Sequence, residues 1–168
     1  KEVDDPALWP FYEKVQELGM WLFIHPGPAI YSEYIDYDLG RSVGREGHLM
    51  AVVVRLINGG VLDDFPGLKI VMSHLGGGFA VWMTRILSYQ DKAFWGTEGH
   101  PRHGRKCRRP FREYIDEMLF DTGGLTGDIN PVRATLAEVS PKNILFGTDY
   151  PLEIREGGTV RSFIKKIE

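Results

Sequence analysis

The segment FPGLKIVMSHLGG, from Phe65 to Gly77, is the stretch that decides the fold class. Its apolar run from Ile70 to Met72 has the length of a short buried strand, and the preceding Pro66 ends a helical pattern. Ser73 and His74 follow the apolar run directly, and consecutive glycines then mark a turn before another helical pattern. A buried strand that passes through a short turn into a helix is the repeating unit of a parallel α/β sheet.

On both sides of this segment the same alternation of strands and helices recurs. The predicted strands are Met20 to Ile24, Ile70 to Met72, Met118 to Phe120 and Ile144 to Phe146. The predicted helices are Pro10 to Leu18, Glu46 to Leu62, Phe79 to Tyr89 and Pro131 to Val139, with a last amphipathic segment from Val160 to Ile167. The pattern indicates an α/β fold with a parallel sheet, and no boundary divides residues 1–168 into two domains.

The composition restricts the classes of partner. The chain has 168 residues, of which 43% are hydrophobic, enough for a sizeable core. Its net charge of -3 gives no general electrostatic reason to expect binding to nucleic acid or to an anionic membrane, so a small molecule is the expected partner. Cys107 is the only cysteine and cannot form an intrachain disulfide, and no apolar stretch approaches the roughly 20 residues that cross a bilayer. Without a leader-like pattern at its start, the chain is expected in the cytoplasm.

Polar residues follow all of the predicted strands. His25 comes after the first strand, His74 after the second, Asp121 after the third and Asp149 after the fourth. Because the carboxyl ends of parallel strands meet at one rim of the sheet, their side chains should lie near one another. Imidazole nitrogens and carboxylate oxygens gathered at such a rim can bind a divalent cation and activate a water molecule or a substrate. A single His at a strand end is more often a structural hydrogen-bonding residue, so a structural role and a metal site both stay open.

The long connection from Pro26 to Val43 leaves the first strand on this same rim, which makes it the candidate substrate loop. Tyrosines recur in it every three residues, at Tyr31, Tyr34 and Tyr37. Tyr31 and Tyr34 could stack on a planar substrate ring, or the tyrosines could form a packed cover without chemistry. Arg41 or Arg45 could add a cationic partner, and the spacing selects neither of them.

Three segments resemble, in order, three consecutive signatures of the amidohydrolase-related family. They are LFIHP at Leu22 to Pro26, FPGLKIVMSHLGG at Phe65 to Gly77, and NILFGTDYP at Asn143 to Pro151. That family includes aminocarboxymuconate-semialdehyde, resorcylate and carboxyvanillate decarboxylases together with some hydrolases and hydratases. The resemblance implies a TIM (β/α)₈ barrel with a mononuclear metal site, of which residues 1–168 form the C-terminal half, about four β/α units that carry strands five to eight.

The resemblance also implies roles for the residues at the strand ends. By the family pattern, His25 is a metal ligand, His74 is a catalytic His beside the metal, and Asp149 is a ligand or a proton carrier. The expected ion is Zn²⁺, with Mn²⁺ as the alternative, since nitrogen and oxygen ligands suit both. Arg85 resembles an Arg with which some of these decarboxylases hold a substrate carboxylate across a dimer interface, and an ion-paired helix Arg is the ordinary alternative.

One departure from the family pattern is large. The His-x-His pair that the family carries on its first strand is absent, since His100 and His103 stand three apart in a loop that a parallel sheet places on the opposite face. A barrel of this kind needs about 250 residues, so the first strands of the barrel are expected to be missing from this chain. An open half-barrel exposes strand edges and apolar surface. We expect it to self-associate as a homo-oligomer or to require the missing half, and to be inactive alone.

Three further features have interpretations without catalysis. The basic run from Arg102 to Arg109 lacks interleaved aromatic residues and lies in a helix-to-strand loop, which favours a subunit contact over nucleic-acid binding. The glycines from Gly76 to Gly78 lack the spacing and the following Lys of a phosphate loop, which favours close passage of the backbone beside His74. Asp121 has no role in the resemblance and is interpreted as structural.

These features predict a metal-dependent lyase that decarboxylates an aromatic or unsaturated carboxylic acid, with His74 and Asp149 managing the proton. The same side chains would serve a hydrolase of the same family, in which an activated water attacks an ester, lactone or amide. A third alternative is a non-catalytic interaction fragment that has lost its metal site. The absent strands would line much of the pocket, so the identity of the acid stays open.

Overall fold

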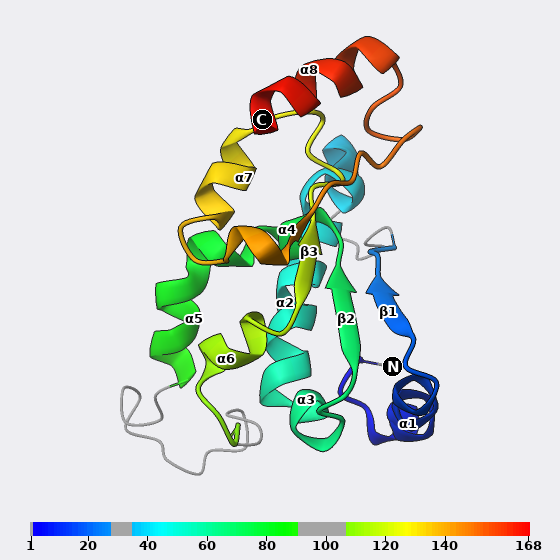
Figure 1. Cartoon of the computed structure of the whole chain (residues 1–168), viewed down its shortest axis with the longest axis vertical. Helices are drawn as coiled ribbons and strands as arrows, with labels where there is room; N and C mark the ends of the chain where they lie inside the picture. Colours follow the sequence, from blue (N-terminus) through cyan, green and yellow to red (C-terminus); the bar gives the residue numbers. More distant parts are fainter. Residues whose placement is uncertain (1, 28–34, 91–106) are drawn as a thin grey trace.

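The sheet contains parallel strands whose order in space follows their order in the chain (Figure 1). The computed structural model describes residues 2–27, 35–90 and 107–168. In these ranges the strands are β1 (Trp21–Ile24), β2 (Lys69–Met72), β3 (Leu119–Asp121) and β4 (Ile144–Leu145). Each pairs with the next in parallel. The predicted parallel α/β fold is therefore confirmed, and each strand agrees with its prediction to within one residue at either end.

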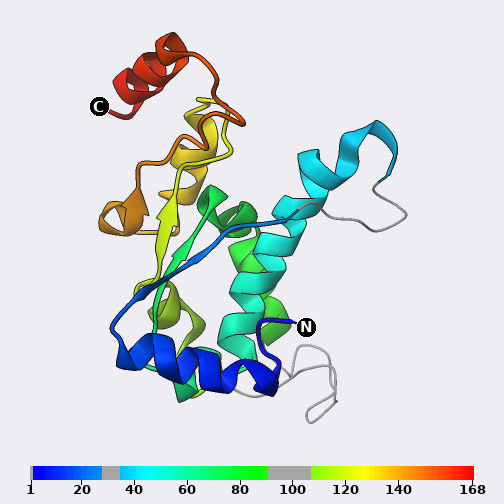
Figure 2. The same cartoon turned by 90° about the vertical axis from the view of Figure 1, so that its right-hand side faces the viewer.

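Helices connect the strands and extend beyond the last one. They are α1 (Trp9–Glu17), α2 (Arg45–Asn58), α3 (Val61–Asp64), α4 (His74–Gly77), α5 (Met83–Gln90), α6 (Phe111–Ile115), α7 (Asn130–Thr135) and α8 (Gly157–Ile167). Shorter turns are η1 (Pro6–Leu8), η3 (Asp36–Asp38), the π-helical η4 (Gly40–Gly44), η5 (Phe79–Trp82) and η8 (Pro141–Asn143). Figure 2 shows α2 running alongside the strands and α1 at the end of the sheet where the strands begin. Of the helices in the described ranges, none is long and apolar enough to cross a membrane.

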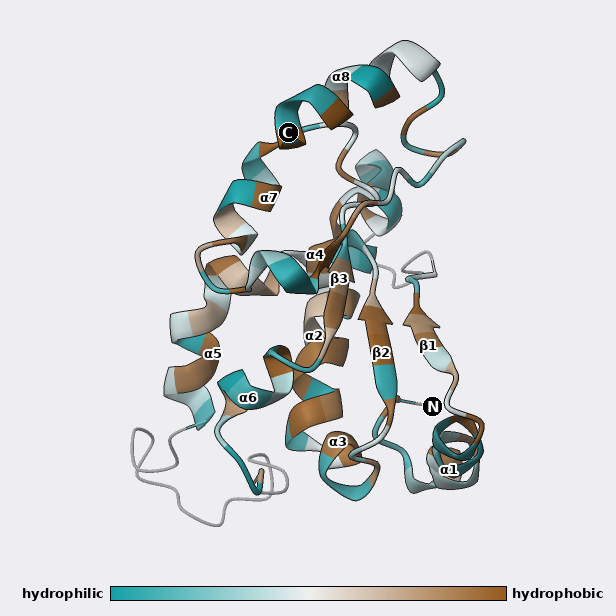
Figure 3. Cartoon of the chain, viewed as in Figure 1, coloured by the Kyte–Doolittle hydropathy of each residue, from teal (hydrophilic) through white to brown (hydrophobic). Residues whose placement is uncertain are grey.

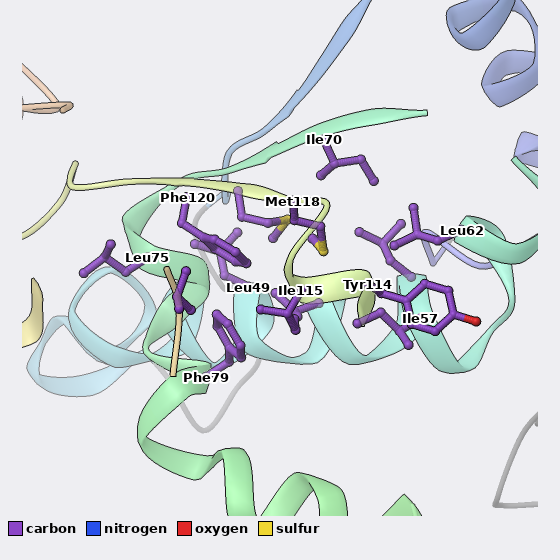
Figure 4. Close-up of a cluster of buried hydrophobic side chains, with 14 of the residues drawn as sticks. Leu49, Ile57, Leu62, Ile70, Leu75, Phe79, Tyr114, Ile115, Met118 and Phe120 are labelled. Atoms are coloured by element: carbon purple, nitrogen blue, oxygen red, sulfur yellow. The ribbon is translucent and has the colours of Figure 1, made fainter. Parts of the chain in front are cut away.

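The core lies between one face of the sheet and α2. Ile70, Met72 and Phe120 come from β2 and β3, and each is at most 1% exposed. Figure 4 shows Ile70 and Phe120 on the strand side of this layer, with Leu49 and Ile57 on the helix side. Most of β2 and the adjoining turns of α2 are coloured as hydrophobic in Figure 3. Full burial of one such side chain contributes about 1.5–3 kcal/mol, so this layer holds the strands on the helix.

The other face of the sheet is only partly covered by the described residues. Leu22 and Ile24 of β1 pack against the core, whereas Trp21 and Phe23 are 52% and 55% exposed. This alternation follows from the two-residue repeat of a strand, which sends successive side chains to opposite faces. Both faces of β1 therefore carry large apolar side chains, a property of strands that are covered on two sides.

Two helices end before their sequence patterns do, and the helix predicted from Phe79 begins at Met83 after the 3₁₀ turn η5. The helix predicted from Glu46 to Leu62 ends at Asn58, and α3 begins after two glycines. Gly60 has a φ of 77°, a left-handed conformation that commonly stops a helix at glycine. The helix predicted from Pro131 to Val139 ends at Thr135, while the short helix α6 was not predicted. The prediction was wrong at the end of α2 because apolar spacing continues across the break that the backbone conformation of Gly60 imposes.

Two residues of the basic run are used within the chain. Arg108 donates to Asp64 Oδ1 at 3.1 Å, and Arg109 forms a bidentate ion pair with Glu117. Hydrogen bonding to Glu117 raises the pKa of Arg109 above its usual value. The rest of the predicted subunit contact, up to residue 106, lies outside the described residues.

Candidate functional site

Three of the polar residues at the strand ends lie together. His25 follows β1 directly, His74 lies two residues beyond the end of β2, and Asp149 lies four residues beyond the end of β4. One ligand atom from each side chain can be chosen such that all lie within 4.8 Å of one another. The common rim expected from parallel strands is therefore present, because pairing in register brings these strand ends to one edge.

Asp149 stands between the two imidazole rings. Its Oδ1 is 3.6 Å from His25 Nε2, and its Oδ2 is 3.7 Å from His74 Nε2. The two rings lie edge to face, with centroids 5.0 Å apart and an interplanar angle of 87°. Both ring nitrogens thus face the same carboxylate at distances longer than a hydrogen bond.

Two atoms of this cluster are buried without a hydrogen-bond partner in the described part of the chain. They are His74 Nε2 and Asp149 Oδ2. Such buried polar atoms are uncommon in folded proteins, because losing water without a replacement partner costs free energy. A cation held between them would provide that partner, and nitrogen and carboxylate donors are suitable for a divalent metal ion. The residues present therefore fit a metal ion.

His74 occupies a left-handed backbone turn. Its φ is 51°, and every following residue through Gly78 also has a positive φ. Asp149 has a φ of 53°. A non-glycine residue in this region costs about 1–3 kcal/mol, and such residues cluster at functional sites. Asp121 supports the turn, since its buried Oδ1 accepts hydrogen bonds from the backbone N–H groups of His74 at 3.1 Å and Gly123 at 2.7 Å.

The glycines after His74 allow two segments to approach closely. A Cβ at Gly77 would lie 2.0 Å from the carbonyl oxygen of Glu46, at the start of α2. A Cβ at Gly124 would lie 2.6 Å from Nδ1 of His74. Gly77 is therefore a close-approach residue, but it lies against α2 rather than beside His74, and the backbone that passes next to the imidazole ring is that of Gly124.

Glu46 contacts His74 and was not identified from the sequence. Its Oε1 lies 3.0 Å from His74 Nδ1, on the side of the ring opposite to the Nε2 that faces Asp149. Arg45 Nε donates to the same carboxylate at 3.3 Å and its guanidinium also pairs with Glu153. The local pattern shows only an acidic residue in the first turn of a helix, a common position for Glu, so no signal in the sequence distinguishes it.

A pocket of about 340 Å³ opens beside this contact. Its lining includes Arg41, Arg45, Glu46, His74 and Glu153. Among the described residues, His25 and Asp149 do not line it. Arg41 lies at its exposed edge and pairs with Asp38 through two hydrogen bonds, which lower the pKa of the Asp38 carboxyl below its usual value. Arg41 in the candidate substrate loop and Arg45 at the start of α2 are thus both bound to carboxylates.

Of the three proposed substrate-binding residues, Arg85 lies in the described part of the chain, and it belongs neither to the cluster nor to the lining of the pocket. Arg85 is exposed on α5, where its guanidinium donates to the hydroxyl of Tyr89 at 2.9 Å and lies 4.8 Å from the centre of that ring. Tyr31 and Tyr34 lie outside the described residues. Tyr37 is described and is 91% exposed.

The chain is similar in sequence and in structure to known proteins. Residues 1–161 match the family described as Amidohydrolase. The 2-amino-3-carboxymuconate-6-semialdehyde decarboxylase of Dictyostelium discoideum is 28% identical over 166 residues, which span 93% of this chain and 42% of that protein. The solved 5-carboxyvanillate decarboxylase of Sphingomonas paucimobilis is 27% identical with a TM-score of 0.82, over 98% of this chain and 48% of its own.

A further solved relative shares the fold at lower identity. The 5-carboxyvanillate decarboxylase of Novosphingobium aromaticivorans, in complex with manganese and 4-hydroxy-3-methoxy-5-nitrobenzoic acid, has a TM-score of 0.83 at 18% identity, over 96% of this chain and 46% of its own. The chain thus spans about half the length of the relatives that it matches, and its fold is that of half a TIM barrel. Since only residues 162–168 fall outside the family match, the assignment is direct: the chain belongs to the Amidohydrolase family.

Proposed function

We propose that the protein carrying this chain is a metal-dependent decarboxylase of an aromatic or unsaturated carboxylic acid. The observation that carries the proposal is the cluster of His25, His74 and Asp149 at one rim of a parallel sheet. The relatives add the reaction class, since those that we compare are named decarboxylases of carboxymuconate-semialdehyde or carboxyvanillate. A carboxylic acid of this kind is the proposed partner, and a homo-oligomer is the proposed assembly.

The proposed ligands of the divalent metal ion within this chain are His25 and Asp149. Their facing atoms are His25 Nε2 and Asp149 Oδ1, 3.6 Å apart. Zn²⁺ remains the ion expected from the donor set, and Mn²⁺ the alternative, which gains support from the manganese in one solved relative. When bound, the ion would hold the oxygens of the substrate and stabilise negative charge that develops on them.

His74 is the proposed proton carrier. Its Nε2 faces the cluster, and its ring is 1% exposed, so a proton that this nitrogen takes up and passes on during turnover would be shielded from bulk water. Decarboxylation breaks a carbon–carbon bond, releases carbon dioxide and leaves an electron pair on carbon that takes up a proton. Asp149, with one oxygen near each imidazole, would orient both rings and take part in moving that proton.

Carbon dioxide release is the test of this proposal. The complete protein, loaded with Zn²⁺ or Mn²⁺, should release carbon dioxide from at least one acid in a panel of hydroxybenzoates, carboxyvanillate and muconate-like acids. A matched panel of esters, lactones and amides tests the hydrolase alternative, which the same side chains would serve. Hydrolysis without any release of carbon dioxide would reject the decarboxylase and support the hydrolase, and inactivity on both panels with no bound metal would support the non-catalytic alternative.

A further inference from the structure

We infer that Glu46 is a positioning residue that keeps the proton of His74 on Nδ1, so that the lone pair of Nε2 is directed at the cluster. The consequence for turnover rests on the proposed function of His74, whereas the position of the proton does not. The inference begins from the 3.0 Å contact between Glu46 Oε1 and His74 Nδ1.

The contact selects one of the two neutral forms of the imidazole ring. A carboxylate oxygen accepts hydrogen bonds and has no hydrogen to donate, so Nδ1 must be the donor. In the neutral ring the other nitrogen then carries a lone pair. That nitrogen is Nε2, which is buried and lacks a hydrogen-bond partner in the described part of the chain. Glu46 therefore makes His74 present an unprotonated Nε2, with its lone pair, to a ligand at the rim.

Glu46 is itself held in place by Arg45. Arg45, the preceding residue, donates to its Oε1 at 3.3 Å and also pairs with Glu153. The side chain of Arg45 is only 13% exposed, so this pairing is weakly screened by solvent. Glu153 belongs to the segment that also carries Asp149, and the pair thus ties this segment to the start of α2. The carboxylate of Glu46 is thus linked through Arg45 to the segment that carries Asp149.

The ring of His74 has little space to flip, a motion that would change which nitrogen faces Glu46. Gly124 lies against it so closely that a Cβ there would come within 2.6 Å of Nδ1, 2.7 Å of Cγ and 2.8 Å of Cε1. The ring is 1% exposed and its backbone is anchored by Asp121. A carboxylate on one nitrogen of a packed imidazole is the arrangement that fixes tautomer and orientation at metal sites in general.

The matched pair of variants is Glu46→Gln and Glu13→Gln. Gln retains the size of Glu but can either donate to Nδ1 or accept from it, so the preference for one tautomer should be lost. Glu13 is exposed on α1 and serves as the control for removal of one carboxylate. We expect Glu46→Gln to lower kcat by about 10- to 100-fold with little change in KM, the range typical of such supporting carboxylates, and Glu13→Gln to change neither.

The direct readout is ¹⁵N NMR of the metal-free protein labelled at histidine, with the His74 signals assigned from the His74→Asn variant. In the unsubstituted protein we expect Nδ1 to carry the proton and Nε2 to have the shift of an unprotonated nitrogen, and we expect Glu46→Gln to abolish this pattern. A proton on Nε2 in the unsubstituted protein would overturn the inference even if the variant fails to fold. An unchanged pattern in a folded Glu46→Gln protein would overturn it as well.

The same data separate this inference from the proposed function. If the nitrogen shifts follow the expectation but no carboxylic acid is decarboxylated, the positioning role of Glu46 stands and the proposed function fails. If carbon dioxide is released and Glu46→Gln leaves both kcat and the shifts unchanged, the proposed function stands and the positioning role fails.

Discussion

At the scale of single residues, the turn after His74 shows how two adjacent glycines can have different constraints. Gly77 and Gly78 both have a positive φ, 65° and 78°. A Cβ at Gly77 would collide with the carbonyl oxygen of Glu46, whereas a Cβ at Gly78 would meet nothing within 4 Å. The first glycine is thus needed for both conformation and space, and the second for conformation alone.

Substitution of these glycines by Ala should separate the two effects. Both variants place a non-glycine residue in a left-handed conformation, which costs about 1–2 kcal/mol per residue. Gly77→Ala must also move α2 away, so we expect it to lower the free energy of unfolding by a further amount of about 1–3 kcal/mol. Urea unfolding of the two variants measures the difference, and equal stabilities would contradict the close approach of α2.

A second prediction at this scale concerns His74 in the complete protein. His74→Asn should keep the bound metal, because the proposed ligands His25 and Asp149 remain, yet lower turnover by about 10²-fold or more through loss of proton transfer. Metal content and release of carbon dioxide are the measurements, with the exposed His48→Asn as control. Loss of the metal in His74→Asn would instead show that this side chain is a ligand.

At the scale of elements, α1 is attached to the residues before it by a buried tyrosine. Tyr12 is 2% exposed, and its hydroxyl donates to the carbonyl oxygen of Val3 at 2.6 Å. Its ring also lies 5.7 Å from that of Phe65, centre to centre. Burial, with a smaller effect of Asp4, raises the pKa of Tyr12 to about 12 from its ordinary 10.0.

This shift predicts a loss of stability at high pH. Below pH 10 the hydroxyl is protonated in both states, and from pH 10 to about 12 the unfolded chain releases a proton that the folded chain holds, so stability falls as pH rises. Tyr12→Phe should cost about 0.5–1.5 kcal/mol at neutral pH through the lost hydrogen bond and should lack this alkaline component. Urea unfolding from pH 8 to pH 12 should therefore show that the free energy of unfolding of the unsubstituted protein falls toward that of Tyr12→Phe as pH rises. For the exposed Tyr37→Phe, the difference from the unsubstituted protein should not change with pH. A constant difference for Tyr12→Phe would argue against the shift.

At the scale of the whole molecule, the sheet presents a second apolar face. Trp21 and Phe23 project from it and are about half exposed, and Leu145 of β4 is 37% exposed. The chain spans about half the length of its relatives, and in a complete (β/α)₈ barrel the inner face of the sheet is covered by the remaining strands. Large apolar side chains gathered on one face favour association.

The 168-residue chain expressed alone should therefore self-associate. Replacing Trp21 and Phe23 by Thr, which keeps strand propensity and removes most of the apolar area, should shift the chain toward the monomer. Light scattering after size-exclusion chromatography gives the mass of each species. The exposed Val81→Thr, which lies outside the sheet, is the control and should leave the mass distribution unchanged. A monomeric unsubstituted chain would refute the prediction.

The strands, their parallel order and the common position of His25, His74 and Asp149 follow from local sequence. Short apolar runs that end in polar residues are recognisable without any long-range information, and the carboxyl ends of parallel strands must meet at one edge. Family resemblance added the expected roles, because chemistry is a property of particular residues rather than of periodicity.

Other features depend on contacts between segments far apart in the chain. The pairing of Glu46 with His74 joins residues 28 positions apart, and the tie between Arg45 and Glu153 joins residues 108 positions apart. In the sequence, Glu46 looks like an acidic residue at the start of any exposed helix. Its neighbours in the chain give no sign of the contact with His74. The left-handed turn at His74 is likewise supported by a hydrogen bond to Asp121 and packs closely against α2, and hydrophobic periodicity reveals neither contact.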